Sequence, residues 1–542
     1  MRDLRCCLLL LLAPVVRCQE QSPFEMLGES GLEGFDARCG LPDKTHIFEV
    51  NGGGLGLEDL NGDGLLDLVA VGGSTVETLR KGEPGTRPQV FFGRGDGGFS
   101  PAGKAWELAP LPWGTGLALG DLDGDGHCDL VLASIGGLAV YRNQGGTGFE
   151  ALPAPTIDGW PTSLALFDLE GDGDLDLFVV RYLKPDLRAI PAKGSGGAIW
   201  KGHPVLFGPE GLEPEADLLF LGDGTGAFTA ADAALSAAPP AFGLGIVATD
   251  FDRDGDTDLY VSNDSCPNHL WRNDGGQLVE VGFASGTSHA ADGREQAGMG
   301  IAVGCLGDDG TPSLFVTNFS GESNALYRPR ARSGGYRERS ARLGIALASH
   351  DRLGWGTGFS DIDFDGDLDL WVLNGHVYPE ADWAGTDTKY AQADQVLWQG
   401  AEGLRRSAPM RCRAVGLAGW SRGRPRRRWR RGFGVLDHGL RPRGAAQHSP
   451  ETRHLVSRRT RTARPQPRRP RGLDRSAKPA RHPARRSPAH CRFPSEQTRA
   501  LHIWTRNHRG SRPGCASPGP AVRAKSSPCN LAACIACSAR DP

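Results

Sequence analysis

The sequence contains no motif of the common catalytic machineries. It has no Gly-x-Ser-x-Gly nucleophile elbow, no His-Glu-x-x-His zinc motif and no phosphate-binding loop. His203 and His376 each stand alone, which is more typical of turn or core histidines than of metal ligands. The abundant carboxylates are accounted for by the loops described below. We therefore expect a protein that is not an enzyme.

The sequence also lacks an apolar run long enough to span a membrane. The longest run, residues 6–16, follows a basic start and fits a secretory signal peptide over residues 1–18. Cys18 could instead be a lipidated cysteine, although Arg17 is a poor fit to the small residue expected before such a site. We expect a secreted, extracellular or cell-envelope protein with no transmembrane span.

The charge is divided sharply near residue 405. Residues 405–542 contain 34 Lys and Arg but 5 Asp and Glu, a net charge of +29, whereas residues 1–404 have a net charge of −32. Of the 13 cysteines, only Cys39, Cys128, Cys266 and Cys305 lie in the acidic part beyond the signal segment. One or two disulfides could form among them in an oxidising compartment, and their spacing leaves the pairing open.

Five copies of one nine-residue pattern occur in the acidic part. Each copy places side-chain oxygens at positions 1, 3, 5 and 9 and a glycine at position 6, as in Asp361-Ile-Asp-Phe-Asp-Gly-Asp-Leu-Asp369. Ca²⁺ takes about six to eight oxygens, so alternate residues must point inward, and glycine permits the sharp turn. An EF-hand would instead close with Glu at position 12 between two helices. The expected ligands of about five structural calcium sites are Asp59, Asn61, Asp63, Asp67, Asp121, Asp123, Asp125, Asp129, Asp168, Glu170, Asp172, Asp176, Asp250, Asp252, Asp254, Asp258, Asp361, Asp363, Asp365 and Asp369.

A sixth copy has lost its ligands. Aligning Ile246 with Ile301 places Cys305, Gly307, Asp309 and Ser313 at the four ligand positions. One carboxylate cannot replace four, so we expect the structural repeat to persist there without calcium.

Each copy lies in a larger unit of about four short strands. A glycine-rich alternating run precedes the loop, an apolar strand follows it, and a hairpin such as Tyr-Arg-Asn or Trp-Arg-Asn with Gly-Gly leads to Gly-x-Phe. The first ligands, counting position 305, are 62, 47, 82, 55 and 56 residues apart. Such spacing predicts an all-β propeller over residues 45–404, with an insertion at 182–215 that passes over one face. Residues 19–44 are expected to be a linker or a closing strand.

These loops, the Gly-x-Phe hairpins and the segment Asn-Gly-His-Val-Tyr-Pro at 374–379 resemble the FG-GAP/VCBS repeats of the cartilage acidic protein family. Integrin α-chain propellers share the calcium loop. The resemblance implies a seven-bladed propeller followed by a small ASPIC/UnbV domain. Six blades are recognisable here, so a seventh blade and the terminal domain are missing from the translated sequence.

The basic tail has the composition expected of out-of-frame translation. With permitted codons, residues 421–434 read one nucleotide later give Val-Ala-Ala-Asp-Leu-Asp-Gly-Asp-Gly-Asp-Val-Asp-Leu, which is the missing loop at the expected place. The run Pro467-Arg-Arg-Pro-Arg-Gly-Leu-Asp474 can likewise give Asn-Arg-Asp-Gly-Leu-Gly-Ala, similar to an ASPIC/UnbV motif. We therefore interpret residues 405–542 as a disordered, frameshifted remnant of the last blade and that domain, through a sequencing error or a real lesion.

Two other interpretations of the tail are less consistent with the sequence. A nucleic-acid-binding arm fits the charge, but aromatic residues are sparse and the protein is expected to be exported, so no nucleic-acid partner is expected. Cys529-x4-Cys534-x2-Cys537 has the spacing of a plant-type iron–sulfur site but lacks a fourth cysteine in an ordered context.

Two functions remain for the propeller. The first is a non-catalytic interaction or adhesion/matrix-type scaffold whose partner is a protein or a glycan. The second is a polysaccharide-binding or polysaccharide-degrading protein that uses the insertion and one face of the disc. Fold alone does not decide between them.

Overall fold

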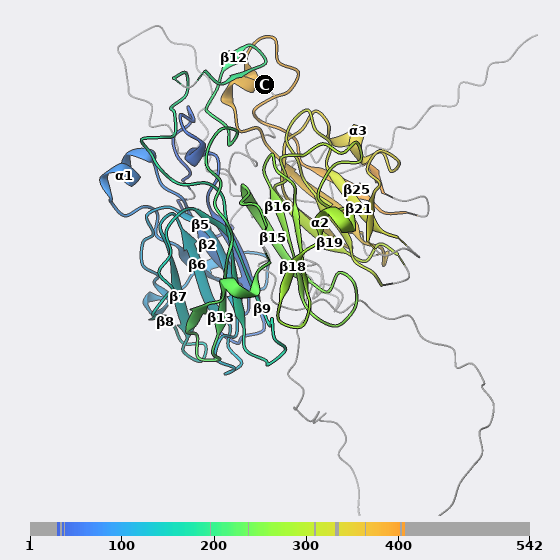
Figure 1. Ribbon diagram of the computed structural model, residues 1–542. Helices are drawn as coiled ribbons and strands as arrows, with labels where there is room; N and C mark the ends of the chain where they lie inside the picture. Colours follow the sequence, from blue (N-terminus) through green and yellow to red (C-terminus); the bar gives the residue numbers. More distant parts are fainter. Residues whose placement is uncertain are drawn as a thin grey trace, which may run out of the picture.

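The chain forms an all-β propeller of six blades in a computed structural model (Figure 1). The structure describes residues 30–406 except 33–34, 37, 196, 237, 308–309, 331–334, 364 and 401–403. Each blade is a four-stranded antiparallel sheet, so the expectation of an all-β propeller with six recognisable blades is confirmed. The signal segment, Cys18 and the tail beyond residue 406, including both frameshift motifs, lie outside the described residues.

The first three blades follow one another in the chain, and the third contains the insertion as a separate two-stranded hairpin. Blade 1 consists of β1 (Gly54–Glu58), β2 (Asp67–Val71), β3 (Gln89–Gly93) and β4 (Phe99–Pro101). Blade 2 consists of β5 (Gly114–Gly120), β6 (Asp129–Ser134), β7 (Gly137–Asn143) and β8 (Phe149–Leu152). Blade 3 consists of β9 (Pro161–Phe167), β10 (Asp176–Arg181), β13 (Leu218–Gly222) and β14 (Phe228–Ala230), and the hairpin of β11 (Ile199–Trp200) and β12 (His203–Pro204).

The last three blades repeat this order without an inserted hairpin. Blade 4 consists of β15 (Gly243–Thr249), β16 (Asp258–Asn263), β17 (His269–Asn273) and β18 (Leu278–Glu280). Blade 5 consists of β19 (Ile301–Gly304), β20 (Ser313–Val316), β21 (Ala325–Pro329) and β22 (Tyr336–Glu338). Blade 6 consists of β23 (Gly354–Ser360), β24 (Asp369–Asn374), β25 (Gln395–Trp398) and β26 (Arg405–Arg406).

Helices are few and short and lie between strands. They are α1 (Val76–Lys81), α2 (Gly282–Ser285), α3 (Ile345–Ser349) and the 3-10 turns η1 (Ile47–Glu49), η2 (Lys104–Trp106), η3 (Asp232–Ala234) and η4 (Pro379–Asp382). Within the described part of the chain, no helix is long and apolar enough to cross a membrane. Cys39, Cys128 and Cys266 are not joined to one another by disulfide bonds.

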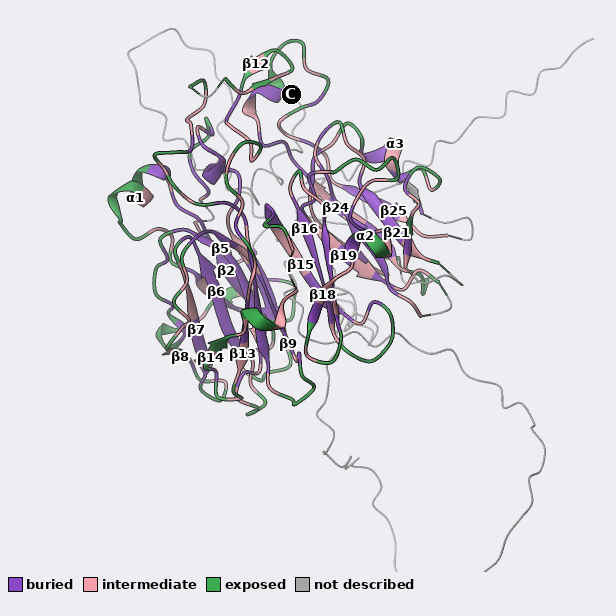
Figure 2. Ribbon diagram, viewed as in Figure 1, coloured by how far each residue is buried: buried purple, intermediate pink, exposed green. Residues whose placement is uncertain are grey.

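The second strand of each blade forms the centre of the core. Strands β2, β6, β16 and β20 are buried along their whole length, as Figure 2 shows for β2, β6 and β16. Both faces of these sheets are covered by neighbouring blades, except that one face of blade 1 is covered by Leu32 and Phe35 of the N-terminal segment. This explains why these strands are continuous apolar runs rather than alternating ones. Apolar clusters join consecutive blades; Val69 of blade 1, for example, packs with Leu130 and Leu132 of blade 2.

Glycines in the first strands allow those strands to approach one another near the centre of the disc. A Cβ at Gly116 of β5 would lie 2.8 Å from the carbonyl oxygen of Thr162 in β9. A Cβ at Gly300, just before β19, would lie 1.9 Å from the carbonyl oxygen of Trp355 in β23. The glycine-rich runs of the sequence are therefore required by close backbone packing.

Blade 6 differs from the others on the face that points away from blade 5. Leu370 and Val372 pack toward blade 5, whereas Trp371 and Leu373, which alternate with them along β24, are only partly buried. Trp398 of β25 is also partly buried. On this face Val396 is nevertheless buried and Leu373 packs against the central apolar cluster, so Trp371 and Trp398 are its partly exposed side chains.

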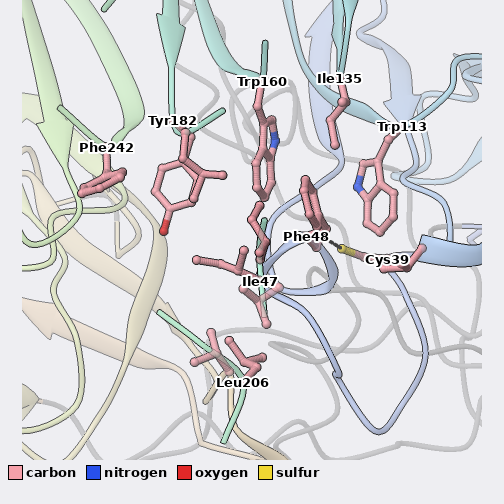
Figure 3. Close-up of a cluster of buried hydrophobic side chains, with 14 of the residues drawn as sticks. Cys39, Ile47, Phe48, Trp113, Ile135, Trp160, Tyr182, Leu206 and Phe242 are labelled. Atoms are coloured by element: carbon pink, nitrogen blue, oxygen red, sulfur yellow. Dashed lines mark hydrogen bonds between the residues drawn. The ribbon is translucent and has the colours of Figure 1, made fainter. Parts of the chain in front are cut away.

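The N-terminal segment closes one end of the central channel. Residues 39–50, which we call the plug, contain η1, and none of the described residues before β1 forms a strand. Phe48 of the plug stacks on Trp160 with ring centroids 4.8 Å apart, and it lies 6.4 Å from Trp113 (Figure 3). Trp113 and Trp160 directly precede the first strands of blades 2 and 3, so the plug occupies the end of the disc opposite the nine-residue loops.

The insertion, which we call the strap, crosses the same end of the disc from blade 3 to blade 6. Lys201 pairs with Asp387, and His203 contacts the carbonyl oxygen of Ala384 at 2.9 Å. In Figure 1 β12 accordingly lies beside the orange segment that follows β24. Trp200 packs on His376, with ring centroids 4.6 Å apart. His376 is 1% exposed, and burial lowers its pKa to about 3, so it is a neutral core histidine at physiological pH.

Two glycosylation sequons begin at Asn263 and Asn318. Both asparagines are 1% exposed; Asn263 ends β16, and Asn318 lies two residues after the end of β20. An acceptor asparagine must be accessible, so neither fits a glycan.

Candidate metal centres

Five nine-residue loops occupy the same place in five blades. Each loop starts directly after the first strand, and its ninth residue is the first residue of the second strand. We number the loops by blade: loop 1 (59–67), loop 2 (121–129), loop 3 (168–176), loop 4 (250–258) and loop 6 (361–369). The degenerate copy in blade 5 is loop 5 (305–313). Because all blades have the same strand order, the loops lie at one end of the disc.

The first aspartate of each loop organises the loop backbone. In loop 1, Asp59 Oδ1 accepts a hydrogen bond from Gly62 N–H at 2.9 Å, and Oδ2 accepts one from Gly64 N–H at 2.8 Å. In loop 2, Asp121 Oδ2 accepts the equivalent bond from Gly126 N–H at 2.9 Å. The carboxylate therefore holds the loop backbone wrapped around itself.

Two positions of the loop require a left-handed backbone. The glycine at position 6 has a positive φ, as the sequence predicts: 88° at Gly126 and 107° at Gly255. Position 4 also has a positive φ, 71° at Gly124 and 69° at Arg253. Arg253 is not a glycine, so loop 4 carries a local backbone strain that the sequence pattern did not reveal.

Three loops bring three carboxylates together. Ligand oxygens from each of the following sets lie within 4.8 Å of one another: Asp121, Asp123 and Asp129; Asp250, Asp252 and Asp254; and Asp361, Asp363 and Asp365. Among the described residues, loops 1 and 3 do not place three carboxylates that close, and they have Asn61 and Glu170 at position 3. All five loops keep the oxygen-only donor set that Ca²⁺ prefers.

Loop 6 contains an oxygen atom that fits a cation. The Oδ1 atom of Asp361 is buried and has no hydrogen-bond partner among the described residues. A buried carboxylate oxygen without a partner is energetically costly unless a positive charge compensates it. The oxygen-rich loop around it, with Asp363 and Asp365, is consistent with calcium.

The ninth residue of each loop has a second role that the pattern alone did not reveal. Asp258 is 1% exposed; its Oδ2 accepts from Phe251 N–H at 2.9 Å, and its Oδ1 accepts from Asn273 N–H at 2.8 Å. The same two bonds, one from position 2 of the loop and one from the last residue of the third strand, recur at Asp67, Asp129 and Asp176. At Asp369 the second bond comes from Gln399, directly after the third strand. The ninth carboxylate thus fastens each loop to its own blade.

Burial raises the pKa of these ninth carboxyl groups. Desolvation raises the pKa of Asp67 and Asp129 to about 6, and that of Asp176 and Asp258 to about 7. Two smaller effects oppose each other: the backbone N–H bonds lower the pKa, and the other loop carboxylates raise it. A cation in the loop would favour the charged form and reverse the effect of desolvation.

These raised pKa values predict a pH dependence. Without calcium, the folded state binds more protons than the unfolded state between about pH 4 and pH 7, so its stability falls as pH rises through this range. Calcium needs the carboxylates deprotonated, so its stabilising effect is expected to be several degrees larger at pH 7.5 than at pH 5. Melting curves with calcium and with chelator at both pH values measure this.

Two other carboxyl groups titrate in the same range. The pKa of Asp217 and of Asp394 is raised to about 7 as well, but these groups lie outside the loops. They therefore shift the melting curve with calcium and the curve with chelator by the same amount. An equal calcium effect at both pH values would contradict the prediction.

The strands that flank loop 5 keep the register of the other blades, but the loop has lost the ligand residues. Gly304 pairs with Ser313, as Thr249 pairs with Asp258 in blade 4, which confirms the alignment of Ile246 with Ile301. Asp309 lies outside the described residues. Ser313 Oγ is buried, and no residue that the structure describes gives it a hydrogen-bond partner.

The third strand of blade 5 has changed together with its loop. Tyr327 pairs with Leu314 as Trp271 pairs with Leu259, so Pro329 occupies the place of Asn273. Proline has no N–H, so the loss of the ninth carboxylate leaves no donor unsatisfied there. Ser313 at the ninth loop position and Pro329 in the third strand thus occur together. Comparing the third strands across the repeats would have revealed this in the sequence.

Comparison with known proteins supports the repeat assignment. The model of the FG-GAP-like repeat matches residues 59–132 and 121–179, which cover loops 1 to 3, so the chain contains FG-GAP-like repeats. No curated protein sequence matches the chain significantly.

Several solved structures are similar to this chain at low identity. A lectin from Agrocybe aegerita, described as recognising non-reducing terminal N-acetylglucosamine, is 15% identical over 66% of this chain and 79% of its own, with a TM-score of 0.35. A protein from Lactobacillus plantarum is 17% identical over 62% of this chain and 80% of its own, with a TM-score of 0.36. A putative exo-β-1,3-galactanase from Bifidobacterium bifidum is 11% identical over 54% of this chain and 90% of its own, with a TM-score of 0.29. At these TM-scores the similarity carries no inference about a ligand.

Proposed function

We propose that this chain is an exported, calcium-binding propeller that acts as a non-catalytic interaction scaffold of the adhesion or matrix type. The observation that carries the proposal is the repetition of one oxygen-rich loop at the same place in five blades. The loops lie at the ends of separate blades and are wrapped in their own backbone amides, so the ions would stabilise the scaffold rather than take part in a reaction. Asp121, Asp123, Asp125 and Asp129 would hold the ion of loop 2, and the equivalent residues would hold the others. A bound ion would neutralise the clustered carboxylates.

A glycan partner has a specific observation in its favour. The strap brings aromatic side chains together at the end of the disc opposite the loops, and Trp383, packed edge-on against His203, is 48% exposed. An exposed, rigidly held indole is a common anchor for a partner. The runner-up function, a polysaccharide-binding or polysaccharide-degrading protein, would use this end of the disc.

A binding screen separates these functions. The full chain is applied to a glycan array and to extracellular protein ligands, and it is incubated with a polysaccharide panel to detect hydrolysis. We expect binding without hydrolysis; release of sugars would overturn the non-catalytic assignment. Trp383→Ala, with exposed Leu347→Ala as the matched surface control, tests whether a bound glycan uses the strap end.

We also propose that the reading frame shifts near residue 405 and that the gene encodes a seventh blade and an ASPIC/UnbV domain, as the family resemblance implies. The partly covered face of blade 6 at Trp371 and Trp398 supports a missing neighbour. Sequencing the gene is expected to show that codons 421–434, read one nucleotide later, spell a sixth intact nine-residue loop, beginning Asp-Leu-Asp-Gly-Asp. Codons that do not spell it would contradict the frameshift.

The remaining features of the proposal concern export and the binding partner. The apolar N-terminus supports a secretory signal, with a lipid anchor at Cys18 as the alternative. Calcium is abundant outside cells, which agrees with export. The partner is a protein or a glycan, and no nucleic acid is expected.

A further inference from the structure

Asn143 and Asn273 occupy the same place in blades 2 and 4. Each ends the third strand of its blade and starts an Asn-x-Gly-Gly turn, and they are 0% and 1% exposed. The Oδ1 atom of Asn143 accepts a hydrogen bond from Gly146 N–H at 2.9 Å, and that of Asn273 accepts one from Gly276 N–H at 2.8 Å. The turn therefore fixes the amide orientation and directs each NH₂ group away from its own hairpin.

Asn273 connects two loops in adjacent blades. Its backbone N–H donates to Asp258, the ninth residue of loop 4, at 2.8 Å. Its Nδ2 donates to the carbonyl oxygen of Leu169, the second residue of loop 3, at 2.9 Å. The N–H of Leu169 in turn donates to Asp176, the ninth residue of loop 3, at 2.7 Å. One buried residue thus links the closing carboxylates of two loops.

Asn143 makes the same connection between loops 1 and 2. Its N–H donates to Asp129 of loop 2 at 2.7 Å, and its Nδ2 donates to the carbonyl oxygen of Leu60 in loop 1 at 2.8 Å. The N–H of Leu60 donates to Asp67 at 3.0 Å. The two connections match in these bonds, and Asn143 Nδ2 also donates to the carbonyl oxygen of Cys128 in loop 2 at 3.1 Å.

No such amide joins loops 2 and 3 among the described residues. The equivalent residue in blade 3 is Gly222, where a Cβ would lie 2.2 Å from the carbonyl oxygen of Leu175. Blade 5 has Pro329 at this place, and there Tyr336 OH donates instead to Phe251 of loop 4 at 3.1 Å. The asparagine connections therefore divide loops 1 to 4 into two pairs.

We propose that calcium binds cooperatively within two pairs of loops, loop 1 with loop 2 and loop 3 with loop 4, and that Asn143 and Asn273 are the coupling residues. The inference rests on the proposed calcium binding of these loops. An ion that orders one loop also fixes the asparagine, which then holds the neighbouring loop. The second ion consequently meets a loop that is already ordered and loses less conformational entropy. By linkage the effect is reciprocal between the two sites.

The test measures calcium binding at loop 3 while the neighbouring loops are disabled. The full chain is titrated with calcium, and hydrogen–deuterium exchange of peptides covering 168–176 gives the midpoint of loop 3. Asp254→Asn removes an exposed ligand of loop 4 and is expected to raise this midpoint about fivefold or more. The matched control, Asp125→Asn, removes the equivalent ligand of loop 2 and is expected to leave the midpoint unchanged. Asn273→Ala should abolish the effect of Asp254→Asn.

The outcomes separate the coupling from the calcium assignment. An unchanged loop 3 midpoint in Asp254→Asn, or an equal shift in Asp125→Asn, would overturn the coupling while calcium binding stands. A loop 3 that never responds to calcium would overturn the proposed calcium sites and the coupling with them. If Asn273→Ala does not fold, as judged by circular dichroism, the comparison of Asp254→Asn with Asp125→Asn still decides.

Discussion

Chelation of calcium is expected to lower the melting temperature of the full chain by at least about 10 °C at pH 7.5. A site occupied at about a hundred times its Kd stabilises the folded state by about 2.7 kcal/mol, and five loops would bind. Removing the ions also leaves clusters of three carboxylate oxygens within 4.8 Å in loops 2, 4 and 6 without a compensating charge.

The measurement is a thermal melt with excess calcium and with excess chelator. Elemental analysis of the calcium-saturated protein is expected to give about five ions per chain. Magnesium serves as the control, since it demands a smaller and more rigid octahedral site and should restore little of the loss. Identical melting curves with and without calcium would contradict the calcium assignment in all five loops.

Asp258→Ala is expected to destabilise the protein even when calcium is absent. It removes the acceptor of two buried N–H groups, those of Phe251 and Asn273, and each unsatisfied buried donor costs about 1–3 kcal/mol. Burial raises the pKa of Asp258 to about 7, so the charged carboxylate is itself unfavourable in the folded state. Removing it therefore offsets part of this cost above neutral pH. We therefore expect a net loss of at least about 2 kcal/mol in chelator.

Asp254→Ala is the matched control for this prediction. Asp254 belongs to the same loop but is exposed. It takes no part in the two bonds by which Asp258 fastens the loop to the third strand. Both variants should lose calcium stabilisation at loop 4, whereas in chelator Asp254→Ala should melt close to the wild-type temperature. If the two variants melt alike in chelator, the fastening role of the ninth residue is wrong.

The sequence predicted the repeated, local part of the molecule. The loop ligands and their glycine are contiguous in the chain, and the strands beside them follow the hydrophobic pattern, so six blades could be located without a structure. The alignment of the degenerate loop through Ile246 and Ile301 was correct for the same reason.

Contacts between distant segments could not be predicted in this way. Phe48 packs on Trp160, and Asn273 bonds to Leu169, although more than a hundred residues separate each pair. Nothing in the local pattern of either partner identifies the other. The second role of Asp258 was missed because a carboxylate at a ligand position has the same sequence signature whether or not it also holds a neighbouring strand. The Trp-Arg-Asn hairpin was visible in the sequence, but its asparagine had no assigned partner.

The plug and the strap have a mechanical consequence for a disc whose described blades end at blade 6. Blade 6 holds the strap through the ion pairs of Glu380 with Lys193 and of Asp387 with Lys201. Lys193 donates its N–H to Thr45 of the plug at 2.7 Å, and the plug is bound to blade 1 through Gly40 N–H and the carbonyl oxygen of Ser74 at 2.6 Å. The two outermost blades are therefore tied to each other across the mouth of the channel. Through this cap the strap and the plug resist separation of the first and last described blades.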